Sequence, residues 1–222
     1  LTEKNKQQLL EIVQNILPKG VSCVYIRQAE ALGLGHAVLC AKDVVGDEPF
    51  AVILADDLID GENDSCLGQM VKLHSERGCS ILGCETIAKE ETNKYGIVSI
   101  KNVLGRAGKL EQIVEKPAPD EAPSNLAVVG RYILTPRIFE MLEKTGTGAG
   151  GEIQLTDAIS DLIDFEHVMT YEFDGKRYDC GSKLGYLQAT VEYGLKHEGL
   201  GKAFRQYLGN FCNPEVSKPG DS

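Results

Sequence analysis

The sequence lacks the features that mark several large classes of protein. None of its apolar runs approaches the roughly 20 residues that a membrane-spanning helix needs. Basic residues are also scarce, with 23 against 33 acidic ones, which gives a formal net charge of −10. Binding to nucleic-acid polymers depends on basic side chains that contact phosphates. We therefore predict no membrane partner and no nucleic-acid polymer as partner.

The cysteines do not form a pattern that predicts disulfides or a zinc site. There are seven, an odd number, at irregular spacings and with no C-x-x-C pair. Several lie in apolar runs, among them Cys23 and Cys40, where a free cysteine behaves as a small hydrophobic residue. We interpret them as free thiols in a reducing cytoplasm.

The sequence also has no arrangement that indicates a catalytic nucleophile. Its four histidines have no neighbouring serine or cysteine pattern that suggests an activated hydroxyl or thiol. Any chemistry must then come from other side chains.

What is present is the pattern of an α/β protein. The 222 residues, 42% hydrophobic and 25% charged, have an ordinary globular composition and are long enough for one large domain. Apolar spacing predicts alternating helices and strands, which favours a parallel sheet with crossover helices. The predicted helices cover residues 4–17, 33–45, 66–77, 152–163, 182–195 and 200–208, with a short one after 136. The predicted strands cover residues 21–26, 50–54, 79–86, 95–101, 109–115, 126–134 and 167–173.

Two carboxylates follow directly on the predicted strand 50–54. Asp56 and Asp57 stand where ligands bind in open α/β sheets, outside the carboxyl ends of the strands. Such carboxylates suit Mg²⁺, which shares hard oxygen ligands with substrate phosphates. Asp179, before Cys180-Gly181, is the best candidate for a second ligand. The alternative is that these aspartates only cap turns, and the pattern leaves both interpretations open.

Three further segments could bind a ligand. Gly33-Leu34-Gly35 offers backbone N–H groups between a strand and a helix, but Val38 breaks the dinucleotide-binding fingerprint. The amide of Gln28 could pair with a base edge. At Glu115-Lys116, strand neighbours face opposite ways, so we expect no ion pair between them, leaving a carboxylate for hydroxyls and an ammonium for a phosphate. The alternatives are a structural glycine turn, a solvated glutamine and an exposed strand end.

Eight short segments occur in an order that is typical of one protein family. Their sequence closely resembles the bacterial UTP–glucose-1-phosphate uridylyltransferase (UDP-glucose pyrophosphorylase) family from about residue 6 to residue 208. The segments are Arg27-Gln28, Gly33-Leu34-Gly35-His36-Ala37, residues 52–56, Tyr95-Gly96, residues 114–117, residues 124–132, residues 152–158 and Asp179-Cys180-Gly181.

The resemblance implies an α/β, Rossmann-like nucleotide-diphospho-sugar transferase fold with a central mixed sheet. It also implies a cytoplasmic homo-oligomer, a dimer or a tetramer, that forms UDP-glucose and pyrophosphate from UTP and glucose 1-phosphate with Mg²⁺. The matching positions imply a role for each site residue. Gln28 and the Gly33 backbone would bind uracil, and Asp56 and Asp179 would bind the Mg²⁺. Gly96 and Glu115 would bind the glucose, Val128 would line the sugar pocket, and Lys116 would bind the sugar phosphate. Lys116 and Asp56 would be the catalytic residues.

One element of the family pattern is not found in these 222 residues. The family begins with a strand and a Gly-rich loop, G-x-G-T-R-x-x-P-x-T-K in outline, that cradles the triphosphate. We expect this N-terminal strand-loop-helix unit to lie upstream of Leu1, residues 1–209 to be an N-terminally incomplete catalytic domain, and residues 210–222 to be a flexible tail. Missing strands expose sheet edges, so we expect the chain alone to fold poorly or to be inactive.

Three alternatives remain open at this point. One is another sugar-1-phosphate nucleotidyltransferase that uses dTTP or CTP. A second is a metal-dependent glycosyltransferase, although Asp56-Asp57-Leu58 departs from its Asp-x-Asp spacing. The third is a non-catalytic sugar-nucleotide-binding module, supported only by the absence of the phosphate loop.

Overall fold

The structure, a computed structural model, describes residues 7–61 and 63–212 and divides into two units, Leu1–Ala31 and Leu32–Ser222. The first unit contains helix α1 (Gln7–Gln14), within the predicted range 4–17. Residues 21–26, predicted as a buried strand, are irregular and exposed, with Tyr25 94% exposed. That prediction was wrong because no described segment pairs with these residues, and a strand needs a partner for its backbone groups. The extent of the catalytic domain, residues 1–209, stays a prediction.

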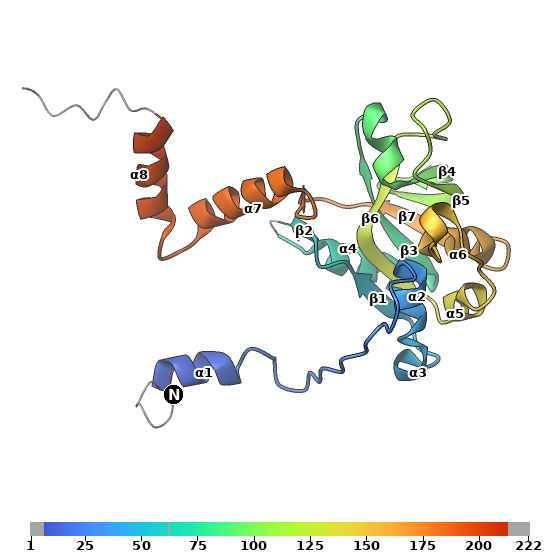
Figure 1. Cartoon of the computed structure of the whole chain (residues 1–222), viewed down its shortest axis with the longest axis horizontal. Helices are drawn as coiled ribbons and strands as arrows, with labels where there is room; N and C mark the ends of the chain where they lie inside the picture. The colour runs from blue at the N-terminus through green and yellow to red at the C-terminus, as the bar shows by residue number, and fades with distance from the viewer. Residues whose placement is uncertain (1–6, 62, 213–222) are drawn as a thin grey trace, which may run out of the picture. The chain divides into compact units, whose positions relative to one another are not determined.

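The second unit is built on a mixed six-stranded sheet with the order β1-β6-β3-β7-β5-β4 (Figure 1). The strands are β1 (Phe50–Ile53), β3 (Ser80–Thr86), β4 (Gly96–Leu104), β5 (Ala107–Glu115), β6 (Leu126–Leu134) and β7 (Val168–Glu172). The predicted strands and the mixed sheet are confirmed, but the expected parallel pairing is wrong for most neighbours. Strand β6 lies between β1 and β3 and runs antiparallel to both, so only β3 and β7 pair in parallel among the described strands.

The helices are α2 (Leu34–Leu39), α3 (Lys42–Val45), α4 (Cys66–Arg77), α5 (Arg137–Leu142), α6 (Leu155–Leu162), α7 (Lys183–Lys196) and α8 (Gly201–Cys212), with short 3₁₀ turns η1 (Lys89–Lys94) and η2 (Ala149–Gly151). Helices α2, α5 and α6 pack on one face of the sheet and α4 packs on the other, whereas α7 and α8 contact each other. The predicted helix 33–45 is divided into α2 and α3, and α6 begins three residues later than predicted. Helix α8 continues to Cys212, so residues 210–212 are not a tail; residues 213–222 lie outside the described residues. Within the described ranges, no helix has the length and apolar character to cross a membrane.

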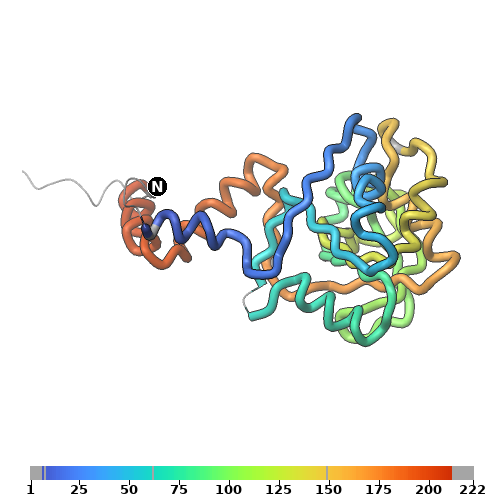
Figure 2. The backbone as a smooth tube through the Cα atoms, turned by 90° about the horizontal axis from the view of Figure 1, so that it is seen from below, coloured from blue at the N-terminus to red at the C-terminus, as the bar shows by residue number. Residues whose placement is uncertain are grey.

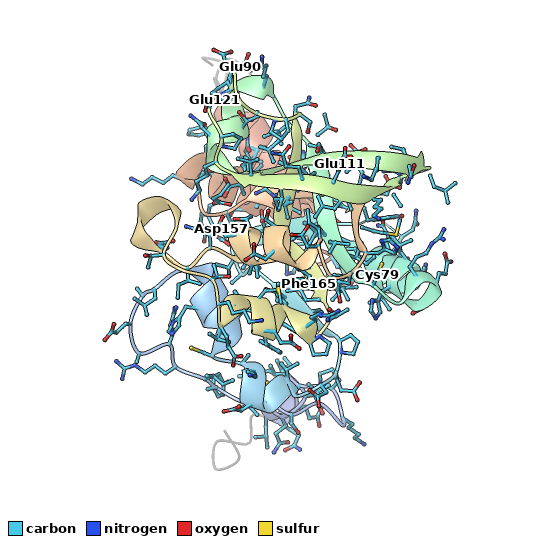
Figure 3. The ribbon with its side chains drawn as sticks, turned by 90° about the vertical axis from the view of Figure 1, so that its right-hand side faces the viewer. Cys79, Glu90, Glu111, Glu121, Asp157 and Phe165 are labelled. Carbon is cyan, nitrogen blue, oxygen red and sulfur yellow. The ribbon has the colours of Figure 1, made fainter. Side chains whose placement is uncertain are left out.

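Alternate residues of β6 supply the two halves of the core. Val128, Tyr132 and Leu134 face the cluster formed with α2, α5 and α6, whereas Val129 and Ile133 face the cluster formed with α4. This division follows from the period of two along a strand. On the solvent side, Glu111 projects from β5 (Figure 3) and pairs with a lysine of β4.

A second, two-stranded sheet was not expected. Residues 57–60 form β2 (Asp57–Asp60), which pairs antiparallel with β8 (Lys176–Asp179) and sets Asp57 opposite Asp179. The chain then enters α7, where Ser182 is the predicted N-cap and accepts a hydrogen bond from the Gly185 N–H at 3.0 Å. The backbone trace in Figure 2 shows how segments from both halves of the sequence combine in this unit.

Six cysteines are free thiols in the structure, namely Cys23, Cys40, Cys66, Cys79, Cys84 and Cys180. Cys66, Cys79 and Cys84 are buried, whereas Cys23, predicted within an apolar strand, is exposed because that strand does not form. Burial raises the pKa of the Cys66 thiol to about 11. The buried thiols therefore act as packing residues at neutral pH.

The packing of α4 gives a direct test of the fold. Met70 is fully buried, while its neighbour Val71 is 46% exposed on the same helix. We expect Met70→Ala to lower the free energy of unfolding by about 2–5 kcal/mol because it leaves a cavity against β3 and β6. Val71→Ala should change it by less than about 0.5 kcal/mol. Urea denaturation of both variants measures the difference; equal losses would contradict this packing.

Candidate active site

Most of the residues predicted to bind a ligand meet in one pocket of the second unit. The pocket has a volume of about 370 Å³ and is lined by residues at the ends of β1, β4, β5 and β8, in the middle of β6 and at the start of α6. Six predicted site residues line it, namely Asp56, Gly96, Glu115, Lys116, Val128 and Asp179. The sequence segments that contribute these residues are separated by up to 123 positions, so only the folded chain brings them together.

Asp56 and Asp179 converge on one point of this pocket. The Asp56 carbonyl accepts a hydrogen bond from the Cys180 N–H at 2.7 Å, which fixes the two segments side by side. A Cβ atom placed on Gly181 would lie 3.0 Å from Asp56 Oδ2 and 3.1 Å from Asp179 Oδ1. Glycine at position 181 therefore leaves the space between the two carboxylates open.

The two carboxylates suit a divalent cation with hard oxygen ligands. In the described part of the chain, neither pairs with a lysine or an arginine. Residues 7–61 and 63–212 contain no cluster of three or more His, Cys, Asp or Glu side chains arranged for a metal. Two protein ligands leave positions for water and phosphate oxygens, which is how Mg²⁺ is commonly bound at phosphate-transfer sites.

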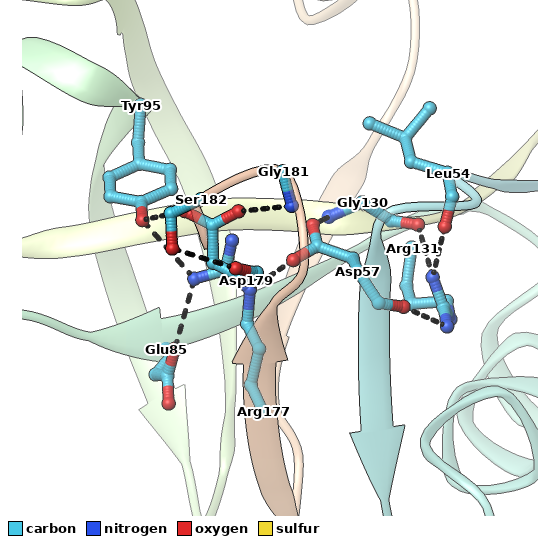
Figure 4. Close-up of polar contacts among 10 residues, drawn as sticks. All are labelled: Leu54, Asp57, Glu85, Tyr95, Gly130, Arg131, Arg177, Asp179, Gly181 and Ser182. Atoms are coloured by element: carbon cyan, nitrogen blue, oxygen red, sulfur yellow. Dashed lines mark hydrogen bonds and ion pairs between the residues drawn. The ribbon is translucent and has the colours of Figure 1, made fainter. Parts of the chain in front are cut away.

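Asp57, the neighbour of Asp56, has a different role. Its buried carboxylate accepts the Gly130 N–H at 2.6 Å and the Nε–H of Arg177, and its backbone carbonyl accepts from Arg131 at 2.6 Å (Figure 4). A Cβ atom on Gly130 would lie only 2.6 Å from Asp57 Oδ2, so the close contact requires glycine there. Asp57 therefore has a structural role, but it joins distant segments and does not cap a turn. The turn-capping alternative fits Asp179, whose Oδ1 accepts a hydrogen bond from the Gly181 N–H at 3.1 Å.

Arg177 lines the pocket and neutralises two carboxylates, those of Asp57 and Glu85. Its side chain is only 8% exposed, pairs with Asp57, and lies 3.6 Å from Glu85. Burial opposes the charge of Arg177, but hydrogen bonds to Tyr95 and Asp57 and the charge of Asp57 raise its pKa overall. Burial also raises the pKa of Glu85, and the charge of Arg177 opposes that shift. Asp57 and Glu85 thus share one buried cation.

Tyr95 connects this cation to the carboxylate pair. The Arg177 guanidinium lies 5.0 Å from the centre of the Tyr95 ring and 3.4 Å from its hydroxyl. The same hydroxyl lies 3.5 Å from Asp179 Oδ2 (Figure 4). Arg177 therefore stabilises the position of Tyr95 beside Asp179 through both charge and the aromatic face.

Glu115 and Lys116 occupy another side of the pocket. The Thr156 hydroxyl donates to Glu115 Oε2 at 2.9 Å, and Gly96 lies opposite Glu115 in the β4–β5 ladder. Glu115 and Lys116 are 3.4 Å apart and do form an ion pair, contrary to the sequence-based expectation. The reason is that Lys116 has a φ of +46°, so it leaves the strand and the alternation of faces ends there.

The two residues predicted to bind a base are placed differently. Gly33 has a φ of +99° at the start of α2, and a Cβ atom on it would lie 2.7 Å from Glu152 Cβ. Its neighbour Leu34 lines the pocket, whereas Gly33 is not among the lining residues. Gln28 belongs to the first unit. The role of both residues in base binding stays a prediction.

Several pocket residues were not found from the sequence. Thr156 and Tyr95 stood inside the segments that carried the family resemblance, directly in the pattern around Glu152 and Gly96. Arg177 lies two residues before Asp179 on β8 and therefore faces the same side of that strand. Recognising residues 176–179 as a strand would have indicated it. The lining residues that the sequence did not predict include Tyr95, Tyr132, Thr156 and Arg177.

The fold and this pocket define a class. Ligands of open α/β sheets bind at the ends of strands, and this pocket, whose lining includes acidic side chains and lysines, lies at such ends. Residues 1–195 match the family described as Nucleotidyl transferase. The chain belongs to this family.

Two relatives with more specific names indicate which members of this family the chain resembles. The UTP–glucose-1-phosphate uridylyltransferase of Escherichia coli (strain K12) is 49% identical over 216 residues, which cover 94% of this chain and 70% of the relative. The enzyme of the same name from Haemophilus influenzae is 44% identical over 220 residues, 96% of this chain and 74% of the relative. Both cover the segments that carry the pocket.

Solved structures agree with the sequence relatives. A UDP-glucose pyrophosphorylase complexed with UDP-glucose superimposes with a TM-score of 0.81 at 45% identity, over 87% of this chain and 74% of that one. A UTP-bound UGPase from Acinetobacter baumannii gives a TM-score of 0.85 at 43% identity, over 94% and 72% of the two chains. The described fold is therefore that of UDP-glucose pyrophosphorylases.

The buried ion pair of Asp57 and Arg177 in the pocket wall can be tested by its effect on stability. We expect Arg177→Met to lower the free energy of unfolding by about 3–5 kcal/mol because it leaves the buried Asp57 carboxylate without its cation. Urea denaturation measures this loss. Lys101→Met, which breaks the exposed pair of Lys101 with Glu111, is the matched control and should cost less than about 1 kcal/mol. Equal effects of the two variants would show that Arg177 is not a structural cation.

Proposed function

We propose that the chain carries the active site of a UTP–glucose-1-phosphate uridylyltransferase, which forms UDP-glucose and pyrophosphate from UTP and glucose 1-phosphate. The observation that carries this proposal is the meeting of six predicted site residues in one pocket of 370 Å³. Relatives and solved structures that are 43–49% identical and bear this name support it. The proposal includes a cytoplasmic location, as expected from the free cysteines.

The proposed reaction needs no nucleophile from the protein. An oxygen of glucose 1-phosphate attacks the α-phosphorus of UTP, a new P–O bond forms, and the bond to pyrophosphate breaks as pyrophosphate leaves with its electron pair. Such a step depends on positioning and on neutralising charge. The absence of an activated serine or cysteine is consistent with this chemistry.

Each group of pocket residues would have a separate role in binding the metal or the substrates. Asp56 and Asp179 would hold Mg²⁺, which neutralises phosphate charge and orients phosphate oxygens when bound. The Lys116 ammonium would bind the sugar phosphate and reduce repulsion between the two anionic substrates. Glu115, held by Thr156, would accept hydrogen bonds from glucose hydroxyls together with the backbone of Gly96, and Val128 would line the sugar pocket. Gln28 and the Gly33 backbone would bind uracil.

The alternatives fit the pocket less well. The glycosyltransferase hypothesis does not account for Glu115 and Lys116 lying in the same pocket as the carboxylate pair. A dTTP- or CTP-dependent enzyme would use the same phosphate chemistry. A putative glucose-1-phosphate thymidylyltransferase from Bacillus anthracis is only 22% identical, with a TM-score of 0.64, and this likeness shows the fold alone. UTP is therefore the proposed nucleotide.

We also propose that the chain assembles with copies of itself, as a dimer or a tetramer. The last two helices carry exposed apolar side chains, among them Leu187 on α7 and Phe211 on α8. Contiguous apolar patches on a helix surface commonly mark an interface.

Sedimentation velocity tests this assembly. The double variant Leu187→Lys/Phe211→Lys should sediment as a smaller species than the unmodified protein because charges would be buried in the interface. Val103→Lys, at an exposed apolar position on β4, is the control and should leave the assembly unchanged. A monomeric unmodified protein would contradict the proposed assembly.

The catalytic proposal is tested by replacing each metal-binding carboxylate. We expect Asp56→Asn and Asp179→Asn each to reduce Mg²⁺-dependent UDP-glucose formation by about 100-fold or more because one charged oxygen ligand is lost. Asp174→Asn, on an exposed carboxylate outside the pocket, is the control and should retain activity.

The assay measures UDP-glucose formation from UTP and glucose 1-phosphate with added Mg²⁺. UTP is compared with dTTP and CTP at equal concentration. Normal activity in either asparagine variant would contradict the metal assignment, and faster turnover with dTTP or CTP would contradict the nucleotide assignment.

A further inference from the structure

Thr156 connects the two protein groups that we assign to the glucose hydroxyls. It is the second residue of α6, is only 7% exposed and lines the pocket. Its side chain branches at Cβ into a hydroxyl and a methyl group. The hydroxyl contacts Glu115 and the methyl group faces Gly96, so each branch meets a different part of the proposed sugar site.

The hydroxyl of Thr156 holds one oxygen of the Glu115 carboxylate. It donates a hydrogen bond to Glu115 Oε2 at 2.9 Å. The other oxygen, Oε1, lies 3.4 Å from the Lys116 ammonium. The Glu115 side chain is 13% exposed, whereas that of Lys116 is 52% exposed. Thr156 therefore holds the carboxylate from the protein side, while Lys116 contacts it from the side that is open to solvent.

The methyl group of Thr156 occupies the space beside Gly96. A Cβ atom on Gly96 would lie 2.8 Å from Thr156 Cγ2, closer than two carbon atoms pack, and 3.4 Å from Glu115 Oε2. Gly96 and Glu115 are paired residues of the β4–β5 ladder. Thr156 thus takes the place of a side chain at position 96, and the Gly96 backbone remains open to the pocket that it lines.

We propose that Thr156 is a positioning residue that sets the Glu115 carboxylate and the Gly96 backbone for the hexose. This inference rests on the proposed function, since Thr156 acts through the two groups assigned to the glucose hydroxyls. Without the Thr156 donor, Glu115 keeps its charge but loses the contact that orients it. A carboxylate that turns toward Lys116 or water then accepts less well from a sugar hydroxyl, because binding groups act best when they are held in one geometry.

Two substitutions separate the roles of the two branches. Thr156→Val keeps the shape of the side chain and the methyl group beside Gly96, but it removes the hydrogen-bond donor. Thr156→Ser keeps the donor and removes the methyl group. Both side chains are close in size to threonine, so we expect both variants to fold, which a thermal melt checks.

Calorimetric titration of these variants with UDP-glucose and with UDP tests the hydroxyl. Thr156→Val should bind UDP-glucose about 3- to 10-fold more weakly, equivalent to the loss of one hydrogen bond, and should bind UDP, which lacks the hexose, with unchanged affinity. Thr156→Ser should stay within about twofold of the unmodified protein for both ligands. Thr170→Val removes a buried hydroxyl that donates to the Gly108 carbonyl outside the pocket lining, and as the matched control it should alter neither affinity.

A second site tests the methyl group. Gly96→Ala should weaken UDP-glucose binding by about 10-fold or more, because the new Cβ atom meets Thr156 Cγ2. The double variant Gly96→Ala/Thr156→Ser should recover part of this loss, since serine has no methyl group at that place. The affinity for UDP should stay unchanged in both variants, which separates a change at the sugar site from general damage to the pocket.

Each possible failure has a distinct meaning. Equal affinities of Thr156→Val and the unmodified protein for UDP-glucose, or equal losses for valine and serine, would overturn the role of the hydroxyl. A double variant as weak as Gly96→Ala would overturn the role of the methyl group, and a parallel loss of UDP affinity would contradict a role confined to the sugar. If the unmodified protein bound UDP but not UDP-glucose, the proposed function itself would be contradicted.

Discussion

The short ladder between β2 and β8 is the constraint on which the site depends. It joins segments that are about 120 residues apart and sets Asp57 directly opposite Asp179. Four residues per strand provide few backbone hydrogen bonds, and the buried pair between Asp57 and Arg177 adds a charged contact that also selects the register. Because Cys180 bonds the Asp56 carbonyl at the end of this ladder, a shift of register would separate Asp56 from Asp179.

The acidic groups of the site form two sets, one with a basic partner and one without. Asp57 and Glu85 lie against Arg177 and are neutralised within the protein. Asp56 and Asp179 have no basic partner among the described residues and remain available for a cation. Tyr95 lies between the two sets, stacked on Arg177 and close to Asp179. A protein with a net charge of −10 thus prepares a site for polyanionic substrates by placing single cations rather than by its overall charge.

The sequence was sufficient for elements whose stability is local or whose pattern is strong. Strand β6 and helix α4 were predicted at their observed bounds because both have clear apolar periods and end at turn residues or a glycine. It was insufficient where distant segments decide the structure. Residues 57–60 read as a loop because their partner strand is far away in the chain, and residues 21–26 read as a strand although no described segment pairs with them. Within the site, the two pocket aspartates were predicted from their position after strands. Arg177 would have followed from its spacing of two before Asp179 if residues 176–179 had been recognised as a strand, whereas the hydrogen bond of Thr156 to Glu115 joins distant segments. The pairing of Glu115 with Lys116 was missed because a single positive φ ends the alternation of faces.

We propose that Asp56 and Asp179 hold a divalent cation beside a hexose that lies against Glu115. A crystal structure of the protein grown with UDP-glucose and Mn²⁺, with anomalous scattering used to locate the metal, tests this claim most directly. We predict an anomalous peak bound by oxygens of both aspartates, with the glucose ring beside Glu115. A manganese ion bound elsewhere, or a hexose placed outside the pocket that contains Glu115, would contradict it.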